Sequence, residues 1–488
     1  MENNKTSVNF KTAEFTAIMA KLKIKQGKSK YAPILQTVRF FGTSAFDCST
    51  AENPPPRSYI WAQSTDLESS VTIKLNPGKG IYGTYGGGGK AEFDFCVPFA
   101  WLENACRTLK AKKISDFSFI YREITAKNPD GVGLEVVKKE VSIIDAADGD
   151  FSVVCHSFIY GGADFPAVPT IAGYNPIVPA EPNKCQAGAP SPRPEINCPL
   201  VKATFMADHL IAALEAVIRS ASKEDDKHFL SGMLFSSGVD GSKFVASDAR
   251  RLSVYEMSGL NIAPKLAIVY DEKSKKWVEP NNDNGIAATK RERIVPMGAL
   301  KKLMSIAGNK KLFPSGPASA MVEIFTHSTS DACTESHIFF SVGKDIEIVT
   351  RVIEGNFPRY QQIIPKMPLA VSFLVDISAI ESVYGLFAKE KGRVLRLELN
   401  TEKTAYQIMD GKDHAIYGSM PIDRSEVEGD YDLLPSPLII NLEVVLDAAK
   451  GLGAKTLVFG VGSNATPVLV TSDKDANYTG VIMPMRIQ

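Results

Sequence analysis

One pattern of helices and strands occurs three times along this chain of 488 residues, and the repeat limits the possible folds more than any single motif does. Six segments place apolar residues at i, i+3, i+4 and i+7, which is the spacing of one buried helix face. The six stripes are Phe15/Ile18/Met19/Leu22, Leu102/Ala105/Cys106/Leu109, Leu210/Ala213/Leu214/Val217, Leu300/Leu303/Met304/Ala307, Ile380/Val383/Tyr384/Phe387 and Leu442/Val445/Leu446/Ala449. We therefore predict two amphipathic helices in each repeat.

Predicted strands recur between these helices in a constant order. An apolar strand follows the first helix of each repeat, and a hairpin comes next. The strands are predicted over 33–41, 229–235 and 394–399, and the hairpins over 59–75, 244–257 and 405–420. The fold class is therefore α+β, with three repeated domains in which two helices pack on predominantly antiparallel sheets.

Shifts in composition mark the boundaries between the repeats. Residues 169–200 contain eight prolines and show neither helix nor strand periodicity, which predicts an extended connector. We predict a first domain over 1–168, the connector over 169–200, a second domain over 201–366 and a third over 367–488. A further insertion, over 261–290, has the pattern of a small exposed hairpin.

The overall composition is that of a globular protein, with 44% hydrophobic and 23% charged residues. The 55 basic and 55 acidic residues cancel, which excludes a polycation that coats nucleic acid but allows a local basic surface. No apolar run of about 18 residues predicts a membrane span, and the polar N-terminus lacks a signal core, so we expect a cytoplasmic protein. Seven cysteines without CxxC spacing favour reduced thiols, with a Cys185–Cys198 disulfide as the alternative.

Every predicted helix carries lysine or arginine toward or just beyond its C-terminal end. Cations at this position complement the helix dipole, and for a single helix that explanation is sufficient. Six helices that line one surface would instead make it basic, suited to phosphate contact without base reading. The candidate DNA-facing residues on or near these helix ends include Lys21, Lys25, Arg107, Lys110, Arg219, Lys223, Lys301, Lys302, Lys389 and Lys450.

Two distant segments combine apolar side chains with arginine. In the first, two predicted strands flank the corner Asp248-Ala249-Arg250, which brings Leu252 close to the apolar strand that begins near Leu230. The second segment is 481–488, which we predict to be a strand with Val481, Met483 and Met485 on one face. An apolar floor with a cationic rim is typical of a groove that docks peptides.

Several motifs that suggest catalysis or ligand binding are better explained as turns. The run 86–90 lacks phosphate-loop spacing, because Thr84 replaces the first glycine and Ala91 follows the lysine. Asp248 is best placed to hold its own turn, as is Asp66 at the equivalent position of the first repeat. The six histidines, at 156, 209, 228, 327, 337 and 414, have no metal-ligand spacing. We therefore expect no catalytic residues, no metal site and no cofactor.

Five motifs in a fixed order on the threefold repeat resemble the bacterial DNA polymerase III beta subunit family, the replicative sliding clamps. The features are the repeat itself, the strand FLSGMLF, the corner ASDARRLSV, the segment VIEGNFPRYQQIIPK and the terminal VIMPMRI. The resemblance extends over nearly the whole chain. It is strongest over 202–260, 294–306, 350–366 and 479–487.

The resemblance implies a non-catalytic processivity factor that encircles duplex DNA. Two three-domain chains would pair head to tail into a closed dimeric ring with pseudo-sixfold symmetry, and twelve helices would line the hole. Expected partners are sequence-independent duplex DNA, a second copy of the chain, the replicative polymerase, an ATP-driven clamp loader, and other proteins with short clamp-binding peptides. No membrane association is implied.

The resemblance also assigns site residues. The peptide groove would use Leu230, Ser247, Ala249, Arg250, Arg251, Leu252, Pro358, Gln362, Ile363, Asn441, Val444, Val481, Met483, Pro484, Met485, Arg486 and Ile487. Family position adds Lys28 and Lys30 to the DNA-facing set, and places Leu109, Phe151, Leu386 and Phe387 at the dimer interface. His228 precedes the strand that begins at Phe229 and is a further DNA-facing candidate, with a plain surface role as the alternative. This chain departs from the family pattern at Ala249, commonly glycine, at Gln362, frequently arginine, and at Val444, frequently aromatic.

Two other functions are compatible with the repeat. A divergent clamp could serve a repair or mobile-element polymerase, and the long connector and the insertion motivate that hypothesis. A DNA-processing enzyme could also be built on a clamp-like repeat. The enzyme would need a catalytic cluster of carboxylates, and the sequence contains no such cluster.

Overall fold

A computed structural model describes most of the chain. The described residues are 3–23, 33–44, 59–75, 81–84, 91–127, 134–146, 152–155, 160–161, 164–166, 168, 200–224, 228–238, 241–257, 269–271, 276–278, 291–310, 312–313, 320–327, 336–343, 345–387, 394–410, 415–462 and 466–485. The connector predicted over 169–200 therefore lies outside them, apart from Leu200. Cys185 and Cys198 lie outside them as well.

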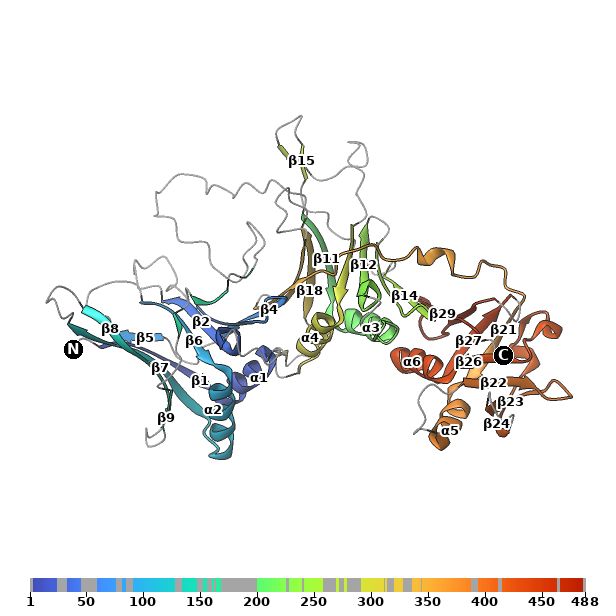
Figure 1. The fold of residues 1–488 in the computed structure, drawn as a ribbon, viewed down its shortest axis with the longest axis horizontal. Coiled ribbons are helices and arrows are strands. Elements are labelled where there is room, and N and C mark those ends of the chain that lie inside the picture. Colours follow the sequence, from blue (N-terminus) through green and yellow to red (C-terminus); the bar gives the residue numbers. More distant parts are fainter. Residues whose placement is uncertain are drawn as a thin grey trace, which may run out of the picture. The chain divides into compact units, whose positions relative to one another are not determined.

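Six α-helices form where the apolar stripes predict them (Figure 1). They are α1 (Thr12–Leu22), α2 (Phe99–Ala111), α3 (Ala207–Ile218), α4 (Met297–Ala307), α5 (Ile377–Phe387) and α6 (Leu442–Leu452). Every stripe residue of α1, α2, α3 and α6 is buried. In α4 the predicted stripe residue Met304 is only partly buried, whereas Ile306, outside the stripe, is buried. In α5 the stripe residue Tyr384 is partly buried.

Helix α6 shows how local sequence sets the ends of a helix. The Asn441 side chain accepts a hydrogen bond from the Glu443 backbone N–H at 2.9 Å, which satisfies one of the donors that a helix start leaves unpaired. Gly453 follows the helix in the left-handed conformation, with φ of 59°, and its backbone N–H returns to the last turn. Asparagine before the helix and glycine after it therefore position the residues of α6 that face the candidate site.

The residues group by contact into two compact units. Unit 1 contains Met1–Asn197, Ser305–Val322 and Phe339–Thr350, and unit 2 contains Cys198–Met304, Glu323–Ile338 and Arg351–Gln488. These two units are defined by contacts between residues, and their bounds do not coincide with those of the three predicted repeats. The three-domain boundaries at 168, 200 and 366 therefore stay predictions.

Unit 1 contains two antiparallel sheets with α1 and α2 packed against them. One sheet has the order β5-β1-β7-β8-β9, and the other includes the run β10-β6-β2-β3-β4-β20-β19. The strands are β1 (Asn3–Lys11), β2 (Thr37–Ser44), β3 (Tyr59–Thr65), β4 (Ser69–Leu75), β5 (Ile81–Thr84), β6 (Ala91–Pro98), β7 (Asp116–Lys127), β8 (Leu134–Asp145), β9 (Ser152–Cys155), β10 (Tyr160–Gly161), β19 (His337–Val342) and β20 (Ile346–Arg351). Phe15 of α1 packs with Phe40 and Phe117, and these rings form the centre of the core.

Unit 2 contains a sheet with the order β17-β12-β13-β14-β29-β28-β27-β21-β25 and a smaller one with the order β24-β23-β22-β26. The strands are β11 (Leu200–Met206), β12 (Gly232–Gly238), β13 (Gly241–Ser247), β14 (Arg251–Glu256), β15 (Val269–Asp271), β16 (Lys276–Val278), β17 (Arg291–Pro296), β18 (Met321–His327), β21 (Val371–Asp376), β22 (Val394–Leu399), β23 (Ala405–Asp410), β24 (Ile416–Pro421), β25 (Glu428–Gly429), β26 (Leu438–Asn441), β27 (Thr456–Val461), β28 (Val468–Thr471) and β29 (Tyr478–Ile482). Helices α3 and α6 lie side by side beneath this arrangement (Figure 1).

One type of strand pairing joins consecutive repeats. The second strand of the first hairpin, β4, pairs with β20 over five residue pairs, from Ser69↔Thr350 to Ile73↔Ile346. The second strand of the next hairpin, β14, pairs in the same way with β29, from Arg251↔Ile482 to Tyr255↔Tyr478. The repeat predicted from sequence is therefore also a repeat of the joints between its copies.

Three predicted strands have different bounds in the structure. The strand predicted over 229–235 begins as a 3-10 turn, His228–Leu230, and β12 starts only at Gly232. The strand predicted over 33–41 likewise begins with a 3-10 turn, Pro33–Gln36. The prediction of a strand over 481–488 is wrong for 483–485, because Pro484 has no backbone N–H with which to extend the ladder, and 486–488 lie outside the described residues.

The β4–β20 joint contains a carboxyl group with an altered pKa. Burial raises the pKa of Glu347 to about 7, so the folded state holds a proton that the unfolded chain releases near its ordinary value of 4.5. Stability should therefore fall as pH rises from about 4.5 to about 7. We expect Glu347→Gln to remove this pH dependence and to raise the free energy of unfolding at pH 8 by about 1–2 kcal/mol, measured by urea denaturation. An unchanged pH profile would contradict the prediction.

Candidate functional site

The corner between β13 and β14 is a tight turn held by its own side chains. The Asp248 carboxylate accepts hydrogen bonds from the backbone N–H groups of Arg250 at 2.9 Å and Arg251 at 3.0 Å. The Ser247 hydroxyl donates to the Arg251 carbonyl at 2.7 Å and accepts from the Ala249 N–H at 3.2 Å. Ala249 takes a φ of 72°, which explains why glycine suits this position. Asp248 therefore has a structural role, as the sequence predicts.

The first repeat contains the same turn. The Asp66 carboxylate accepts from the backbone N–H groups of Glu68 at 3.0 Å and Ser69 at 2.6 Å. The Thr65 hydroxyl donates to the Ser69 carbonyl at 3.0 Å, and Leu67 has a φ of 76°. The predicted equivalence of Asp66 and Asp248 is thus visible bond by bond.

An apolar floor lies beside the Asp248 corner. Leu252 and Val481 face each other across the β14–β29 pairing, and both are buried. They belong to a core cluster with Leu234, Val245, Val254, Ile294 and Tyr360, against which Ile353, Phe357 and Ile364 pack. Leu230, also predicted for the groove, is buried at the end of the 3-10 turn that precedes β12.

The C-terminal segment after β29 continues past this floor. The Met483 N–H donates to the Arg250 carbonyl at 2.9 Å, and the Met485 N–H donates to the Ile439 carbonyl at 2.8 Å. These two bonds hold the segment in place although its strand has ended. Met483 and Met485 are 41% and 42% exposed, which is unusual for large apolar side chains and leaves them available to a ligand. Arg486 and Ile487, also predicted for the groove, lie outside the described residues.

The structure separates the two arginines of the corner. Arg250 is exposed, with Nη2 3.8 Å from a Glu224 carboxylate oxygen. The Arg251 side chain is only 9% exposed, and its guanidinium donates to Asp248, to Asp447 of α6 and to the Arg219 carbonyl. Arg250 can therefore form the cationic rim. The Arg251 guanidinium instead supports the corner from below through its hydrogen bonds.

The remaining groove candidates differ in exposure. Pro358, Gln362 and Ile363 are exposed along the segment that follows β20, and Ile363 is 42% exposed. Val444 is buried in α6, one turn beyond Asn441. The amide of Asn441 is already engaged as the helix cap. The structure thus brings the described groove candidates into one unit.

The equivalent joint in the first repeat has a different chemistry. Ser70 of β4 takes the place of Leu252, and Thr350 of β20 takes the place of Ile482. The hydroxyl oxygens of Ser69 and Thr350 are 3.0 Å apart, so a side-chain hydrogen bond links the two strands of this joint. A hydroxyl-lined joint cannot accept apolar peptide anchors as an aliphatic floor can. The two joints therefore share one geometry and differ beside the corner, where the first has hydroxyl groups and the second has Leu252 and Ile482.

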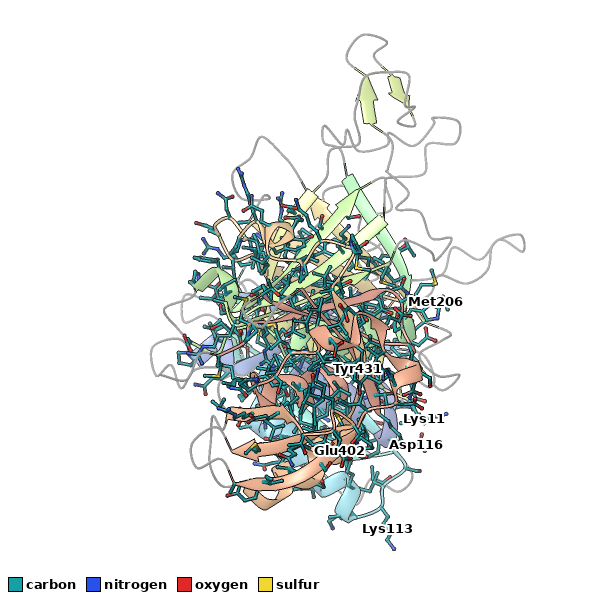
Figure 2. All side chains as sticks on the ribbon, turned by 90° about the vertical axis from the view of Figure 1, so that its right-hand side faces the viewer. Lys11, Lys113, Asp116, Met206, Glu402 and Tyr431 are labelled. Carbon is teal, nitrogen blue, oxygen red and sulfur yellow. The ribbon has the colours of Figure 1, made fainter. Side chains whose placement is uncertain are left out.

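Cations occur at the described helix ends, in different environments. Arg107, Lys110, Arg219, Lys223, His228, Lys301 and Lys450 are exposed, whereas Lys302 is partly buried. Lys21 donates to the Ser305 carbonyl and hydroxyl, each at 2.7 Å, and partial burial lowers its pKa. Just beyond α2, Lys113 points away from the ribbon (Figure 2). Lys25, Lys28, Lys30 and Lys389 lie outside the described residues.

The predicted dimer-interface residues include one error. Leu109 is fully buried in α2 against unit 1, so it has no surface to offer a second chain. It belongs to the apolar stripe, and the prediction that places it at an interface is wrong. Leu386 and Phe387 lie in the last turn of α5, with side chains outside the described set, as is Phe151.

Sequence reasoning missed two groups of residues at this site. Asp447 is the partly buried partner of the Arg251 guanidinium, 196 residues away in the chain. Ser220, Ser253 and Tyr478 form a buried chain of hydroxyls across the β14–β29 joint, at 2.7 and 3.0 Å. Tyr255 adds a hydrogen bond to Asp475 at 2.7 Å. The only indication in the sequence that Asp447 faces this site is its position on the same helix face as Val444 and Gly451.

Within the described ranges, no three His, Cys, Asp or Glu side chains are grouped as a metal site. None of the helices seen in those ranges has the length and apolarity needed to cross a membrane.

Solved structures with this arrangement cover 99% of the chain. A sliding clamp of Pseudomonas aeruginosa bound to griselimycin matches with a TM-score of 0.64 at 15% identity, and all of that chain is covered. A DNA polymerase beta subunit of Streptococcus pyogenes matches with a TM-score of 0.65 at 14% identity, again over its whole length. The chain has the sliding-clamp fold. The fold class predicted from the repeat is therefore confirmed.

Sequence comparison gives the same family resemblance. The beta sliding clamp of Synechocystis is 21% identical over 327 residues, which span 66% of this chain and 68% of that protein. The beta sliding clamp of Caulobacter vibrioides is 23% identical over 287 residues, 57% of this chain and 64% of that protein. No family model matches the chain. The clamp fold is thus preserved over its full length at low sequence identity.

Proposed function

We propose that this protein is a non-catalytic sliding clamp that encircles duplex DNA and tethers a replicative polymerase and other partners. The observation that carries the proposal is the joint between repeats. It occurs twice within the chain, as β4–β20 and β14–β29, each with five residue pairs. The clamp fold and the names of the relatives support the same conclusion.

The repeated joint predicts how two chains close a ring. By repeat position, β24 corresponds to β4 and β14, and β9 corresponds to β20 and β29. Each is the terminal strand of its sheet in the order of the described strands. Ile416 on β24 is 56% exposed, as expected of a strand that awaits a partner. Pairing β24 of one chain with β9 of another, twice over, gives a closed head-to-tail dimer.

The mass in solution tests this proposal most directly. A ring of two chains has about twice the mass of the 53.0 kDa chain, and sedimentation equilibrium distinguishes the two states. The pure protein should also show no polymerase or nuclease turnover on labelled primed DNA with Mg²⁺ and nucleotides. Turnover would favour the DNA-processing enzyme. A pull-down that returns only a repair or mobile-element polymerase would favour the divergent clamp.

DNA binding should depend on phosphates and not on base sequence. We expect weak binding to open linear duplex, with an affinity that falls steeply as salt rises. Arg107→Gln with Lys110→Gln, both exposed on α2, should reduce the slope of log K against log salt by up to about 2, since each phosphate contact contributes about 0.9. Lys366→Gln, an exposed lysine away from the helices, is the matched control. Strong preference for one sequence in competition would contradict the prediction.

The groove beside the Asp248 corner would dock the short peptides of these partners. Leu252 and Val481 are buried beneath the groove and support it from below, Met483 and Met485 supply an adaptable exposed wall, and Arg250 supplies a cation at the rim. One groove in each chain follows from the hydroxyl-lined chemistry of the β4–β20 joint. The polymerase and the ATP-driven clamp loader would therefore compete for the same site.

A further inference from the structure

We propose that Asp447 of α6 is a positioning residue of the peptide groove, although it does not line the floor. The inference rests on the proposed docking function. It names the group that holds both walls of the groove in register, and it reassigns Arg251 from peptide contact to internal support.

The Arg251 guanidinium joins three separate elements. Its Nη1 donates to Asp447 Oδ2 at 3.0 Å, its Nε donates to Asp248 Oδ2 at 3.1 Å, and its Nη2 donates to the Arg219 carbonyl at 2.6 Å. Because all three nitrogens are engaged and the side chain is 9% exposed, little of it remains for a ligand. A planar group with this many fixed donors holds its partners in one geometry, which lysine cannot reproduce. Asp447 is the anchor of this group on α6.

The corner in turn supports the opposite wall. The Arg250 carbonyl accepts the Met483 N–H at 2.9 Å, so a shift of the corner moves the C-terminal segment with it. The next bond of that segment, from Met485 to Ile439, ends on β26, the strand that leads directly into α6. Both walls of the groove are therefore tied to the start and middle of α6.

Helix α6 is itself a stiff support. At Gly451, one turn beyond Asp447, an added Cβ would lie 2.7 Å from the Glu215 carbonyl and 3.0 Å from the Ala216 Cα. The backbones of α3 and α6 therefore meet without an intervening side chain. This close packing restrains the α6 backbone that carries Asp447. The other carboxylate oxygen of Asp447 lies 3.7 Å from Nη1 of Arg219, the residue that directly follows α3. The Arg251–Asp447 bond thus fixes the corner to a rigid pair of helices.

The test measures peptide affinity in variants of the full-length protein. The probe is a fluorescein-labelled peptide with glutamine followed by a leucine-phenylalanine end, and fluorescence anisotropy gives its Kd. We expect Asp447→Ala to weaken binding about tenfold, in the range of coupling between residues of one network. Asp447→Asn, which keeps the volume, should show a smaller loss, and Asp447→Glu should recover most of the affinity. Glu215 on α3 lines, together with Asp447, a cavity of about 510 Å³, and Glu215→Gln should bind the peptide as the wild type does.

A double-mutant cycle separates positioning from general loss of stability. Arg251→Lys and Asp447→Ala should be strongly non-additive in peptide affinity, because each breaks the same bond. The oligomer mass and the thermal midpoint of every variant are measured alongside. If Asp447→Ala fails to fold, Asp447→Asn and its cycle with Arg251→Lys decide the question.

The outcomes distinguish this inference from the proposed function. A wild-type chain that does not bind the peptide overturns the groove itself. A wild-type chain that binds, with Asp447→Ala or Asp447→Asn variants of unchanged affinity or additive effects, overturns only the role of Asp447. Weakened binding with rescue by Asp447→Glu and an unchanged mass supports it.

Discussion

A chain with Leu386→Ala and Phe387→Ala should sediment as a monomer, whereas the wild type should sediment at about twice 53.0 kDa. The two residues end α5, and this helix packs on β24, the strand proposed to pair with a second chain. Removing two large apolar side chains should cost several kcal/mol at each of two interfaces. Sedimentation equilibrium across a range of protein concentrations gives the dissociation constant.

The matched control for this prediction is Leu433→Ala. Leu433 is 53% exposed in the C-terminal third of the chain, and it lies outside α5 and β24. It should leave the dimer intact, which would show that loss of exposed apolar surface alone does not separate the chains. A dimer of unchanged dissociation constant in the double variant would mean that the chains meet elsewhere, or that they do not form this ring.

Truncation after Met483 should abolish peptide docking while the ring persists. The truncated chain loses Met485 and its backbone bond to Ile439, together with Pro484 and the residues that follow. Strand β29 ends at Ile482, so every strand pair of the β14–β29 joint remains. We expect the affinity for the labelled peptide to fall about a hundredfold, because a few central contacts carry most of the energy of a small interface. Anisotropy measures the affinity, and sedimentation confirms the mass.

An exposed methionine away from the groove serves as the control for the truncation. Met321 on β18 is 38% exposed, close to the 42% of Met485, and Met321→Ala should bind the peptide as the wild type does. The polymerase peptide and the loader peptide should fail together in the truncated chain, since both are proposed to use one groove. Unchanged affinity would place the docking site elsewhere and would remove the role proposed for the C-terminal segment.

The sequence pattern was sufficient to predict the helices and turns, which depend on residues that are neighbours along the chain. All six helices lie where the stripes predict them, because a helix face is a property of residues three and four apart. The Asp248 corner and its Asp66 counterpart follow from turn chemistry within five residues. The repeat itself also predicted the fold class, since three similar segments must build three similar packed units.

Tertiary structure decided whatever depends on distant partners. Arg251 and Arg250 are adjacent arginines with equal claims in the sequence, yet only the meeting with Asp447, 196 residues away, turns Arg251 inward. Leu109 looked suitable for an interface until packing against α1 and the sheets of unit 1 left it no exposed surface. The alternation of apolar residues likewise predicted a terminal strand through Met485. The absence of an N–H on Pro484 and the bonds to Arg250 and Ile439 end that strand early and expose both methionines at the groove.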